Sequence, residues 1–335
     1  MMQTTPSYEP TSTEARKPAP QRVLVFGASG VIGAAAATAL RTQAPQVQVR
    51  LATSRARKAE RLRASHPDCE VVQADYLELP SLLTAFDGVD GVFVVTPDFM
   101  DETRAMSNVV AAAFAANRPI HIVRLTGDPP GVHSEDAIPD SLRAFGGGTA
   151  VQHLRARRIL ETSGLPVTYL NIAAYFMADF AKLFGVGIAR QRTLFVPYDR
   201  VMAYLDGRDA GEAAAALLLS TNARHLGKTY HLDNGVDLMR FADAAQVMSE
   251  ALGVSIRYDD SPEHFIQACA QMPVYRGRED ALRYAMRYFE WERESETLWR
   301  RTDVLQMLLG RPGRTLRAWF EEHRSLLLGD TPSTP

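Results

Sequence analysis

The stretch Arg22-Val-Leu-Val-Phe-Gly27-Ala-Ser-Gly30-Val-Ile-Gly33-Ala-Ala-Ala-Ala decides the fold of this chain. Its first five residues form a short apolar run that predicts a buried strand, and the alanines after Gly33 favour a helix. Three glycines at a spacing of three let the backbone between them approach a bulky anion, at which the helix N-terminus directs unpaired N–H groups. A strand, a glycine turn and a helix in this order predict a dinucleotide-binding turn. The residues expected to hold the diphosphate are Gly27, Ala28, Ser29, Gly30, Val31, Ile32 and Gly33.

The composition argues against several other classes of protein. Of the 335 residues, 46% are hydrophobic and 23% are charged, and the net charge of −2 gives no reason to expect nucleic acid or an anionic membrane as a partner. The two cysteines, without a C-x-x-C spacing, predict neither a disulfide framework nor a metal site. The first residues lack the apolar core of a signal peptide, and the sequence has no apolar run of about 18 residues to span a membrane. We therefore expect a cytoplasmic protein in which residues 1–20 form a disordered, proline-rich leader.

The end of the second predicted strand, Val47–Ala52, indicates which dinucleotide binds. A site that prefers NAD usually places an acidic residue about 20 residues after the glycines, where it binds the ribose hydroxyls. Here the sequence reads Thr53-Ser54-Arg55, with no acid. A guanidinium can bind a 2′-phosphate through a fork of charge-assisted hydrogen bonds. The sequence thus predicts NADP(H) as the cofactor and Arg55 as its 2′-phosphate contact; a solvated, basic start of a helix is the alternative interpretation.

Strand and helix patterns alternate through the first two thirds of the chain, and this alternation predicts an α/β fold. The expected architecture is a doubly wound parallel Rossmann sheet, with ligand groups gathered at the C-terminal ends of the strands. We expect a nucleotide-binding core over residues 21–171, completed by 206–232, and a smaller, mostly helical substrate-binding region over 172–205 and 233–330. The further strands are predicted at Glu70–Ala74, Gly91–Val95, Pro119–Leu125, Val167–Asn171 and Lys228–Leu232.

Polar residues and loops that follow the strands are the next candidates for the site. Asp75 either meets the adenine edge or caps the following helix. Thr96 and Pro97 end the fourth strand, where we expect them beside the cofactor, and Thr126 ends the fifth. Residues 127–148 form a long connection, which in a compact domain is usually functional or mobile; whether it closes over the site as a lid stays open.

Aromatic residues suggest where a substrate could lie. We expect those of residues 172–205, which stand among glycines and a proline, at the mouth of a pocket. Near the C-terminus, two stripes have helical spacing, and one of them packs on the core. The other covers an aromatic substrate or a partner subunit of a homodimer, or it packs in the core or at its rim, which is the favoured interpretation. The pocket residues are Tyr175, Phe176, Phe180, Phe184 and Phe195; the stripes are Leu282, Met286 and Phe289, and Tyr284, Tyr288 and Trp291. In a helix expected over Asp101–Ala116, the buried side carries Val109, Val110 and Phe114.

Together these motifs resemble one family. Gly27-Ala-Ser-Gly-Val-Ile-Gly33 resembles the cofactor turn of the NmrA-like group of atypical short-chain dehydrogenase/reductases, and Leu160-Glu-Thr-Ser-Gly-Leu-Pro-Val-Thr-Tyr-Leu-Asn171 is similar to its helix and sixth strand. The likeness extends over roughly residues 22–325. It implies a Rossmann core, NADP(H) binding and a smaller C-terminal substrate region. Members of the family include quinone and ketone reductases, aromatic ether or imine reductases and non-enzymatic redox-sensing regulators.

The sequence departs from the wider superfamily in its catalytic slot. Short-chain reductases generally carry Tyr-x-x-x-Lys on the helix after the fifth strand, and this Tyr donates a proton to the substrate carbonyl. Alignment back from Ser163-Gly164 places Thr149 at the Tyr position and His153 at the Lys position. A threonine hydroxyl is too weak an acid to replace tyrosine unaided, whereas His153 titrates near neutrality and can donate a proton or a hydrogen bond. Thr126 stands where related reductases often carry a carbonyl-orienting Ser or Thr; it either holds the substrate oxygen or only caps its strand.

His153 itself has two interpretations. It is either a proton donor or ribose contact beside the nicotinamide, or a surface or satisfied helix histidine. Arg157 lies one turn further along the same helix face, and its charge would lower the pKa of His153, which disfavours the imidazolium at neutral pH.

The sequence favours an NADPH-dependent reductase of a small, aromatic or quinone-like, carbonyl or conjugated substrate. Hydride would pass from the nicotinamide without help from a Tyr-x-x-x-Lys pair. A rival hypothesis is a cofactor-sensing binding protein without turnover; the missing pair favours it, and the lack of a basic DNA-binding segment disfavours it. A third hypothesis is a non-redox isomerase or lyase in which the bound dinucleotide has only a structural role.

Overall fold

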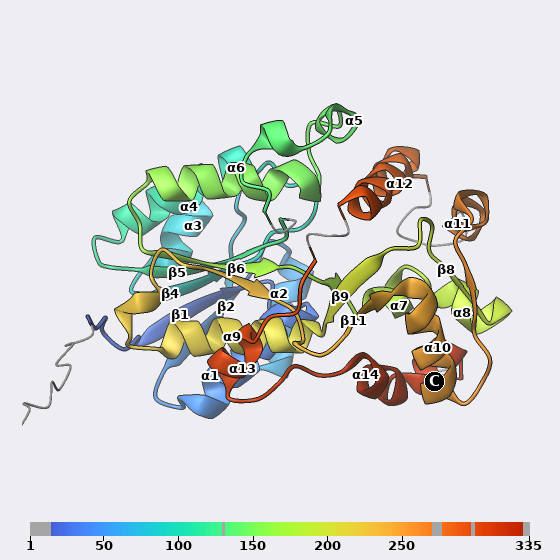
Figure 1. The fold of residues 1–335 in the computed structure, drawn as a ribbon. Helices are drawn as coiled ribbons and strands as arrows, with labels where there is room; N and C mark the ends of the chain where they lie inside the picture. The colour runs from blue at the N-terminus through green and yellow to red at the C-terminus, as the bar shows by residue number, and fades with distance from the viewer. Residues whose placement is uncertain (1–14, 129–130, 270–276, 296–298, 331–335) are drawn as a thin grey trace, which may run out of the picture.

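The computed structural model describes residues 15–128, 131–269, 277–295 and 299–330. A seven-stranded sheet forms the centre of the first part of the molecule (Figure 1). All neighbouring strands are parallel, in the order β10-β6-β5-β4-β1-β2-β3, which confirms the predicted doubly wound α/β fold. The strands lie close to their predicted bounds: β1 Arg22–Phe26, β2 Gln48–Thr53, β3 Glu70–Gln73, β4 Gly91–Val94, β5 His121–Thr126, β6 Val167–Ile172 and β10 Thr229–Leu232.

Helices cover both faces of this sheet, as Figure 1 shows. Successive side chains of a strand point to opposite faces, so Val25 belongs to one hydrophobic cluster and Leu24 to the other. Because helices cover both faces of the sheet, the sequences of its strands are nearly continuous apolar runs. One face carries α1 (Val31–Gln43), α2 (Ala56–Ser65), α9 (Gly207–Leu219) and α13 (Val304–Leu309); the other carries α3 (Leu79–Phe86), α4 (Glu102–Ala115) and α6 (Thr149–Thr162).

The orientation predicted for α4 is wrong at one residue. Val109 is fully buried and Val110 packs against the same cluster, but the Phe114 side chain is 59% exposed. Phe114 lies five positions after Val109, which places it about 140° from Val109 around the helix at 100° per residue. The buried face continues instead through Ala112 and Ala113.

The second part of the molecule is mostly helical and has its own hydrophobic cluster. Small sheets, β11-β9-β7 and β12-β8, support it. The strands are β7 Tyr175–Phe176, β8 Thr193–Phe195, β9 Val201–Leu205, β11 Leu238–Arg240 and β12 Arg257–Asp259. The helices are α7 Asp179–Lys182, α8 Gly185–Gln191, α10 Phe241–Leu252, α11 Pro262–Cys269, α12 Glu279–Glu294, α14 Leu316–Glu322 and α15 Arg324–Leu328.

The prediction that aromatics of residues 172–205 stand at a pocket mouth is wrong for three of them. Tyr175, Phe180 and Phe184 are buried in the cluster of the second part, where their rings contact one another and Phe241. An aromatic among glycines signals an irregular backbone, and it does not signal exposure. Phe176 and Phe195 are partly exposed, and Phe195 lines a small hollow near His264.

Helix α12 joins the two parts. Its Phe289 belongs to the cluster of the second part, whereas Tyr284 and Trp291 pack with α6 and the long connection. Both aromatic stripes are therefore packed, the second at the rim as the favoured interpretation had it. The connection contains a 3-10 turn, Glu135–Ala137, and the short helix α5 (Asp140–Arg143); a second 3-10 turn, Ala223–His225, precedes β10.

The chain before β1 differs in part from the expected disordered leader. Residues 1–14 lie outside the described residues. From residue 15 on, the chain follows the end of α9: the Lys17 backbone N–H donates to the Thr221 carbonyl at 2.8 Å, and Lys17 Nζ donates to the Leu218 carbonyl at 2.9 Å. Within the described ranges, the structure contains no helix that is both long and apolar enough to cross a membrane, and no group of three His, Cys, Asp or Glu residues placed to hold a metal ion.

Candidate functional site

The glycine turn lies at the point where the strand order reverses. The sheet runs outward from β1 to β2 and β3 on one side and from β4 to β5 and β6 on the other, and such a switch point leaves a crevice at the C-terminal strand ends. Gly27 has a φ of +70°, and a Cβ there would lie 2.6 Å from the Val95 side chain beyond β4. A Cβ on Gly33 would lie 2.4 Å from the Gly27 carbonyl carbon and oxygen. Both glycines are therefore required for the turn to close.

The turn and the helix after it suit an anionic ligand. Gly30 is the N-cap of α1, no side chain caps that helix, and its first turn contains no acidic residue. The N–H groups at the start of α1 are thus available, and the positive end of the helix dipole is not neutralised. Gly27, Ser29 and Gly30 are exposed. The residues present fit the diphosphate of a dinucleotide.

The two residues predicted to contact the adenosine end follow the neighbouring strands. Arg55 is exposed and is the N-cap of α2, just after β2, where its side chain is open to solvent. The Asp75 carboxylate accepts the Leu77 backbone N–H at 2.9 Å, so it closes the turn after β3. Asp75 does not cap α3, whose N-cap is Glu78, and its contact with the adenine edge stays a prediction.

A buried ion pair lies behind the end of β4. Arg124 on β5 and Glu102 at the start of α4 are joined at 2.8 Å, and both side chains are fully buried. Arg124 Nη2 also donates to Thr96 Oγ1 at 2.8 Å, and the Thr96 hydroxyl donates to Glu102. Thr96 is thus fixed by the pair, while its neighbour Pro97 is exposed at the crevice. The pair was not predicted from the sequence, although the charged Arg124 inside the run His121–Thr126 was a signal for it.

His153 lies on the α6 side of this pair and is 8% exposed. Its pKa is lowered well below the ordinary value, first by burial, then by Arg124 and then by Arg157, so the imidazole is neutral at neutral pH. Arg124 Nη2 lies 3.4 Å from His153 Nδ1. An arginine is always a donor, so Nδ1 accepts and the ring proton belongs on Nε2. Nε2 faces Gly127, where a Cβ would lie only 3.3 Å away.

Thr126, at the end of β5, is 1% exposed, and its hydroxyl donates to Asn171 Oδ1 at 2.8 Å. Asn171 on β6 also accepts the Asp128 N–H and donates to the Asp128 carbonyl, both at 2.8 Å. This arrangement supports the strand-end interpretation of Thr126 and leaves its hydroxyl proton occupied.

Asp128 is an unusual member of this group because its carboxylate is almost fully buried. It is 4% exposed, and within the described part of the chain neither oxygen accepts a hydrogen bond. The nearest cation, Arg157 Nη2, is 3.9 Å away. Burial raises its pKa to about 6 against the attraction of Arg157 and Arg124. We call the buried set on this face the polar layer: Glu102, Arg124, Thr126, Asp128, His153 and Asn171.

Thr149 starts α6 on the exposed side of the polar layer. Its hydroxyl donates to Asp98 Oδ1 at 3.2 Å, which ties α6 to the loop after β4. The next backbone N–H, of Ala150, donates to the Tyr284 hydroxyl of α12 at 2.7 Å. Burial raises the pKa of Tyr284, so its phenol keeps its proton. Tyr284 thus brings a tyrosine hydroxyl next to Thr149, the residue in the expected tyrosine position.

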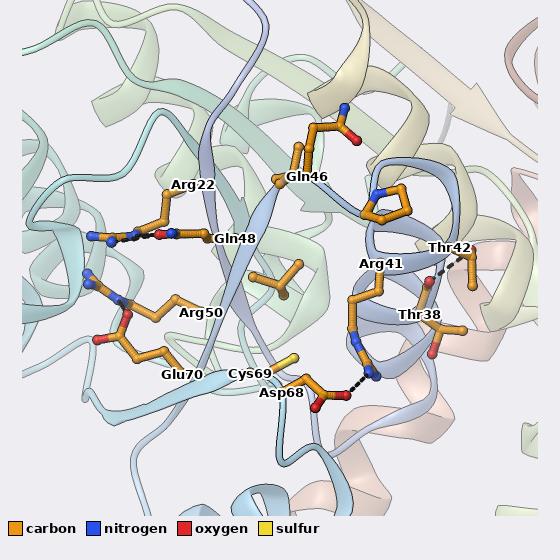
Figure 2. Close-up of a pocket in the computed structure, with 13 residues that line it drawn as sticks. Arg22, Thr38, Arg41, Thr42, Gln46, Gln48, Arg50, Asp68, Cys69 and Glu70 are labelled. Carbon is orange, nitrogen blue, oxygen red and sulfur yellow. Dashed lines mark hydrogen bonds and ion pairs between the residues drawn. The ribbon is translucent and has the colours of Figure 1, made fainter.

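Another hollow lies at the opposite edge of the sheet and is not this site. Figure 2 shows it at the N-terminal ends of β1, β2 and β3, whereas Gly27 follows the C-terminal end of β1. Its volume is about 660 Å³. The arginines that line it are already paired: Arg22 with Gln48, Arg41 with Asp68 and Arg50 with Glu70.

A doubly wound parallel sheet with a glycine cradle at its switch point defines a dinucleotide-binding protein of the Rossmann type. The model of the NmrA-like family matches residues 19–298, and the chain belongs to this family.

The chain is similar to characterised proteins over nearly its whole length. It is 29% identical to a (4-alkanoyl-5-oxo-2,5-dihydrofuran-3-yl)methyl phosphate reductase of Streptomyces griseus subsp. griseus and 25% identical to an NAD(P)H azoreductase of Xenophilus azovorans, each match covering 90% of this chain and 97% of the other. Among solved structures, it resembles the triphenylmethane reductase of Citrobacter sp. complexed with NADP(H), with a TM-score of 0.72, 23% identity and coverage of 90% of this chain and 99% of that one.

Proposed function

We propose that this protein is an NADPH-dependent reductase of a small, aromatic or quinone-like, carbonyl or conjugated substrate. At the level of class it is an NAD(P)H-dependent oxidoreductase with NADP(H) as cofactor: both curated relatives are reductases, one of them named for NAD(P)H, and the solved relative is complexed with NADP(H). The observation that carries the proposal is the glycine cradle at the switch point, with the uncapped N-terminus of α1 behind it.

The chain's own residues divide the work of binding. The backbone from Gly27 to Gly33 holds the diphosphate at the start of α1. Arg55, exposed at the end of β2, selects the 2′-phosphate. Thr96 and Pro97 form the opposite wall, because the end of β4 lies directly against Gly27. The bound cofactor would supply a hydride at this edge, and the protein's contribution is to align it with the substrate.

His153 acts in this proposal as a neutral hydrogen-bond donor. Its lowered pKa argues against an imidazolium acid, and Arg124 occupies its Nδ1. The remaining Nε2–H faces Gly127, whose missing side chain leaves space for a ribose hydroxyl or a substrate oxygen. Thr149 and Asp98 stand nearer to solvent, where they form a route for a proton.

The test compares two cofactors and two variants. Calorimetric titration should show that Arg55→Ala weakens NADPH binding by about 10- to 100-fold, because a bidentate charged contact is lost, while NADH binding changes less than about twofold. Arg57→Ala, an exposed arginine on the same helix, is the matched control and should leave both unchanged. Oxidation of NADPH by wild-type protein in the presence of quinones and ketones tests the reductase activity. Equal losses for the two cofactors would contradict the role of Arg55, and no oxidation with any acceptor would contradict the substrate class.

A further inference from the structure

An apolar groove of about 1150 Å³ opens between α12, α11 and the loop after β4. In Figure 1, α12 lies between α5 and α11, above the second part of the molecule. The groove is larger than a one-ring ligand requires, since pockets for drug-sized ligands span roughly 300–1,000 Å³. Its apolar lining comes from Phe99, Phe145, Tyr198, Ile266, Leu282 and Met286.

Two of these aromatics have a strained backbone. Among the described residues, four that are not glycine have a positive φ, and two of the four are aromatic: Phe99 at +63° and Tyr198 at +59°. Both line this groove. For a bulky side chain this conformation costs of order 1–3 kcal/mol, and it persists only where the surroundings impose it.

Buried polar side chains impose that conformation. The Phe99 N–H donates to Gln152 Oε1 at 2.8 Å, and Gln152 is 1% exposed. The Tyr198 carbonyl accepts a hydrogen bond from Arg200, which is fully buried, at 3.2 Å. The Phe99 ring is nevertheless 43% exposed. The structure therefore holds an aromatic ring in an unfavourable conformation at the open surface, where it contributes little to the core.

The groove adjoins the start of α6. Phe99 follows Asp98, the partner of Thr149, and both Phe99 and Phe145 contact the Tyr284 ring edge-on, with centroids 5.2 and 5.4 Å away. The Tyr284 hydroxyl binds the start of α6. A flat molecule lying along the groove would thus reach the start of α6 with one end.

The charges of the groove indicate what it does not bind. Its two lining arginines are already paired, Arg283 with Asp280 and Arg287 with Glu290 at 2.8 Å. Both cations of the described lining thus have a carboxylate partner, and a third guanidinium, that of Arg293, lies over the Tyr198 ring, 4.8 Å from its centroid. Edge and face contacts from aromatic rings remain, and these suit a conjugated ring system.

From these observations we infer that the groove binds the hydride acceptor, and that this acceptor is an uncharged, flat, conjugated molecule of two or more rings and not a phosphorylated one. The inference rests on the proposed reductase function and adds the substrate class. Phe99 and Tyr198 are its specificity-determining residues.

The test uses 9,10-phenanthrenequinone, with three rings, and duroquinone, with one; both are neutral quinones. Asparagine adopts a left-handed backbone more readily than other residues with a side chain, so Phe99→Asn and Tyr198→Asn remove a ring without adding strain. Thermal unfolding of Phe99→Asn should match that of the wild type, whereas Tyr198→Asn should unfold at a slightly lower temperature because it also loses the Arg293–ring contact. With NADP⁺ present, so that no turnover occurs, phenanthrenequinone binding measured by calorimetry should weaken about tenfold in each variant. Phe114→Ala, which removes an exposed ring on α4, is the control and should bind as the wild type does.

Turnover provides the second measurement. In NADPH oxidation, the KM for phenanthrenequinone should rise about tenfold in Phe99→Asn, while the KM for duroquinone and both kcat values change less than about threefold. Unchanged phenanthrenequinone binding in both folded variants would overturn the groove assignment and leave the reductase function intact. Binding that weakens as expected, in a wild type that oxidises no NADPH, would support the groove and refute the proposed function. A wild type that does not bind phenanthrenequinone at all would overturn the inference.

Discussion

The glycine turn and the polar layer are neighbours at one edge of the sheet, yet they are built from different parts of the chain. The turn consists of backbone at the surface, and its shape depends on the absence of side chains at Gly27 and Gly33. The polar layer consists of buried side chains whose partners come from separate elements. The first should therefore be sensitive to added atoms, and the second to removed or added charge.

Added volume at the turn should have the largest effect. In Gly33→Ala, the new Cβ would lie 2.4 Å from the Gly27 carbonyl group and 2.7 Å from the Ala28 nitrogen, which are backbone atoms and cannot move aside cheaply. We expect a loss of more than about 4 kcal/mol in the free energy of unfolding and no measurable NADPH binding. Chemical denaturation and calorimetry would measure the two quantities.

Gly30→Ala is the matched control. Its Cβ would lie 3.5 Å from the Gly27 oxygen, an ordinary contact, and the φ of Gly30 is −109°. This variant should fold with wild-type stability. Equal destabilisation by both substitutions would show that the close approach at Gly33 is not what fixes the turn.

The second-largest effect on the free energy of unfolding should follow from the loss of one partner in the buried ion pair. Glu102→Ala leaves the Arg124 guanidinium buried and without its carboxylate, which should cost about 3–4 kcal/mol of unfolding free energy. Glu78→Ala breaks an exposed pair with Arg104 at 3.7 Å and should cost less than about 0.5 kcal/mol. Urea denaturation of both variants would test the difference; similar losses would mean that burial does not set the strength of the Arg124 pair.

Removal of the buried Asp128 carboxylate should have a smaller effect of opposite sign on the free energy of unfolding. Burial raises the pKa of Asp128 from 3.8 to about 6, a difference that corresponds to about 3 kcal/mol. This pKa is higher in the folded protein than in the unfolded chain, so protonation of Asp128 favours the folded state. That contribution to the free energy of unfolding is fully present below pH 3.8 and is lost as the pH rises through about 6. Asp128→Asn should thus be about 2–3 kcal/mol more stable than the wild type at pH 8 and similar to it at pH 4. A stability difference between Asp128→Asn and the wild type that is the same at both pH values would refute the raised pKa.

The smallest effect is expected where the two parts of the molecule meet. Tyr284→Phe removes the acceptor for the Ala150 N–H and keeps the ring, so we expect a loss of about 1 kcal/mol and faster hydrogen exchange at the Ala150 amide. Tyr288→Phe, on the same side of α12, is the control. Faster exchange at Ala150 in both variants would contradict a specific role for the Tyr284 hydroxyl.

The same contrast explains how much could be predicted from the sequence. The strands, their alternation with helices and the glycine turn follow from local sequence patterns, so their positions were predicted closely. Arg55 and Asp75 were proposed as cofactor contacts because each stands just beyond the end of a strand, and these roles stay predictions. The packing of Phe180 and Phe184 was not predicted, because an aromatic side chain carries no local mark of the cluster that it joins.

The polar layer was only half visible in the sequence. His153 was singled out, and the lowering of its pKa by Arg157 was correct in direction, but burial and Arg124 have the larger effects. Arg124 and Glu102 are 22 residues apart, and Tyr284 and Ala150 are 134 apart. No periodicity links residues at such separations; only the sheet order and the position of α12 bring them together.

The position of helix α12 between the two parts of the molecule affects how they unfold. Its Phe289 belongs to the hydrophobic cluster of the second part and its Tyr284 and Trp291 to the cluster under α6, so one rigid rod is anchored in both halves of the molecule. The buried Arg200–Glu292 ion pair at 2.6 Å also connects α12 to the residue before β9. A hinge motion that separated the two halves would have to break one of these sets of packing contacts. We therefore expect the two halves to unfold together on heating, in a single calorimetric peak.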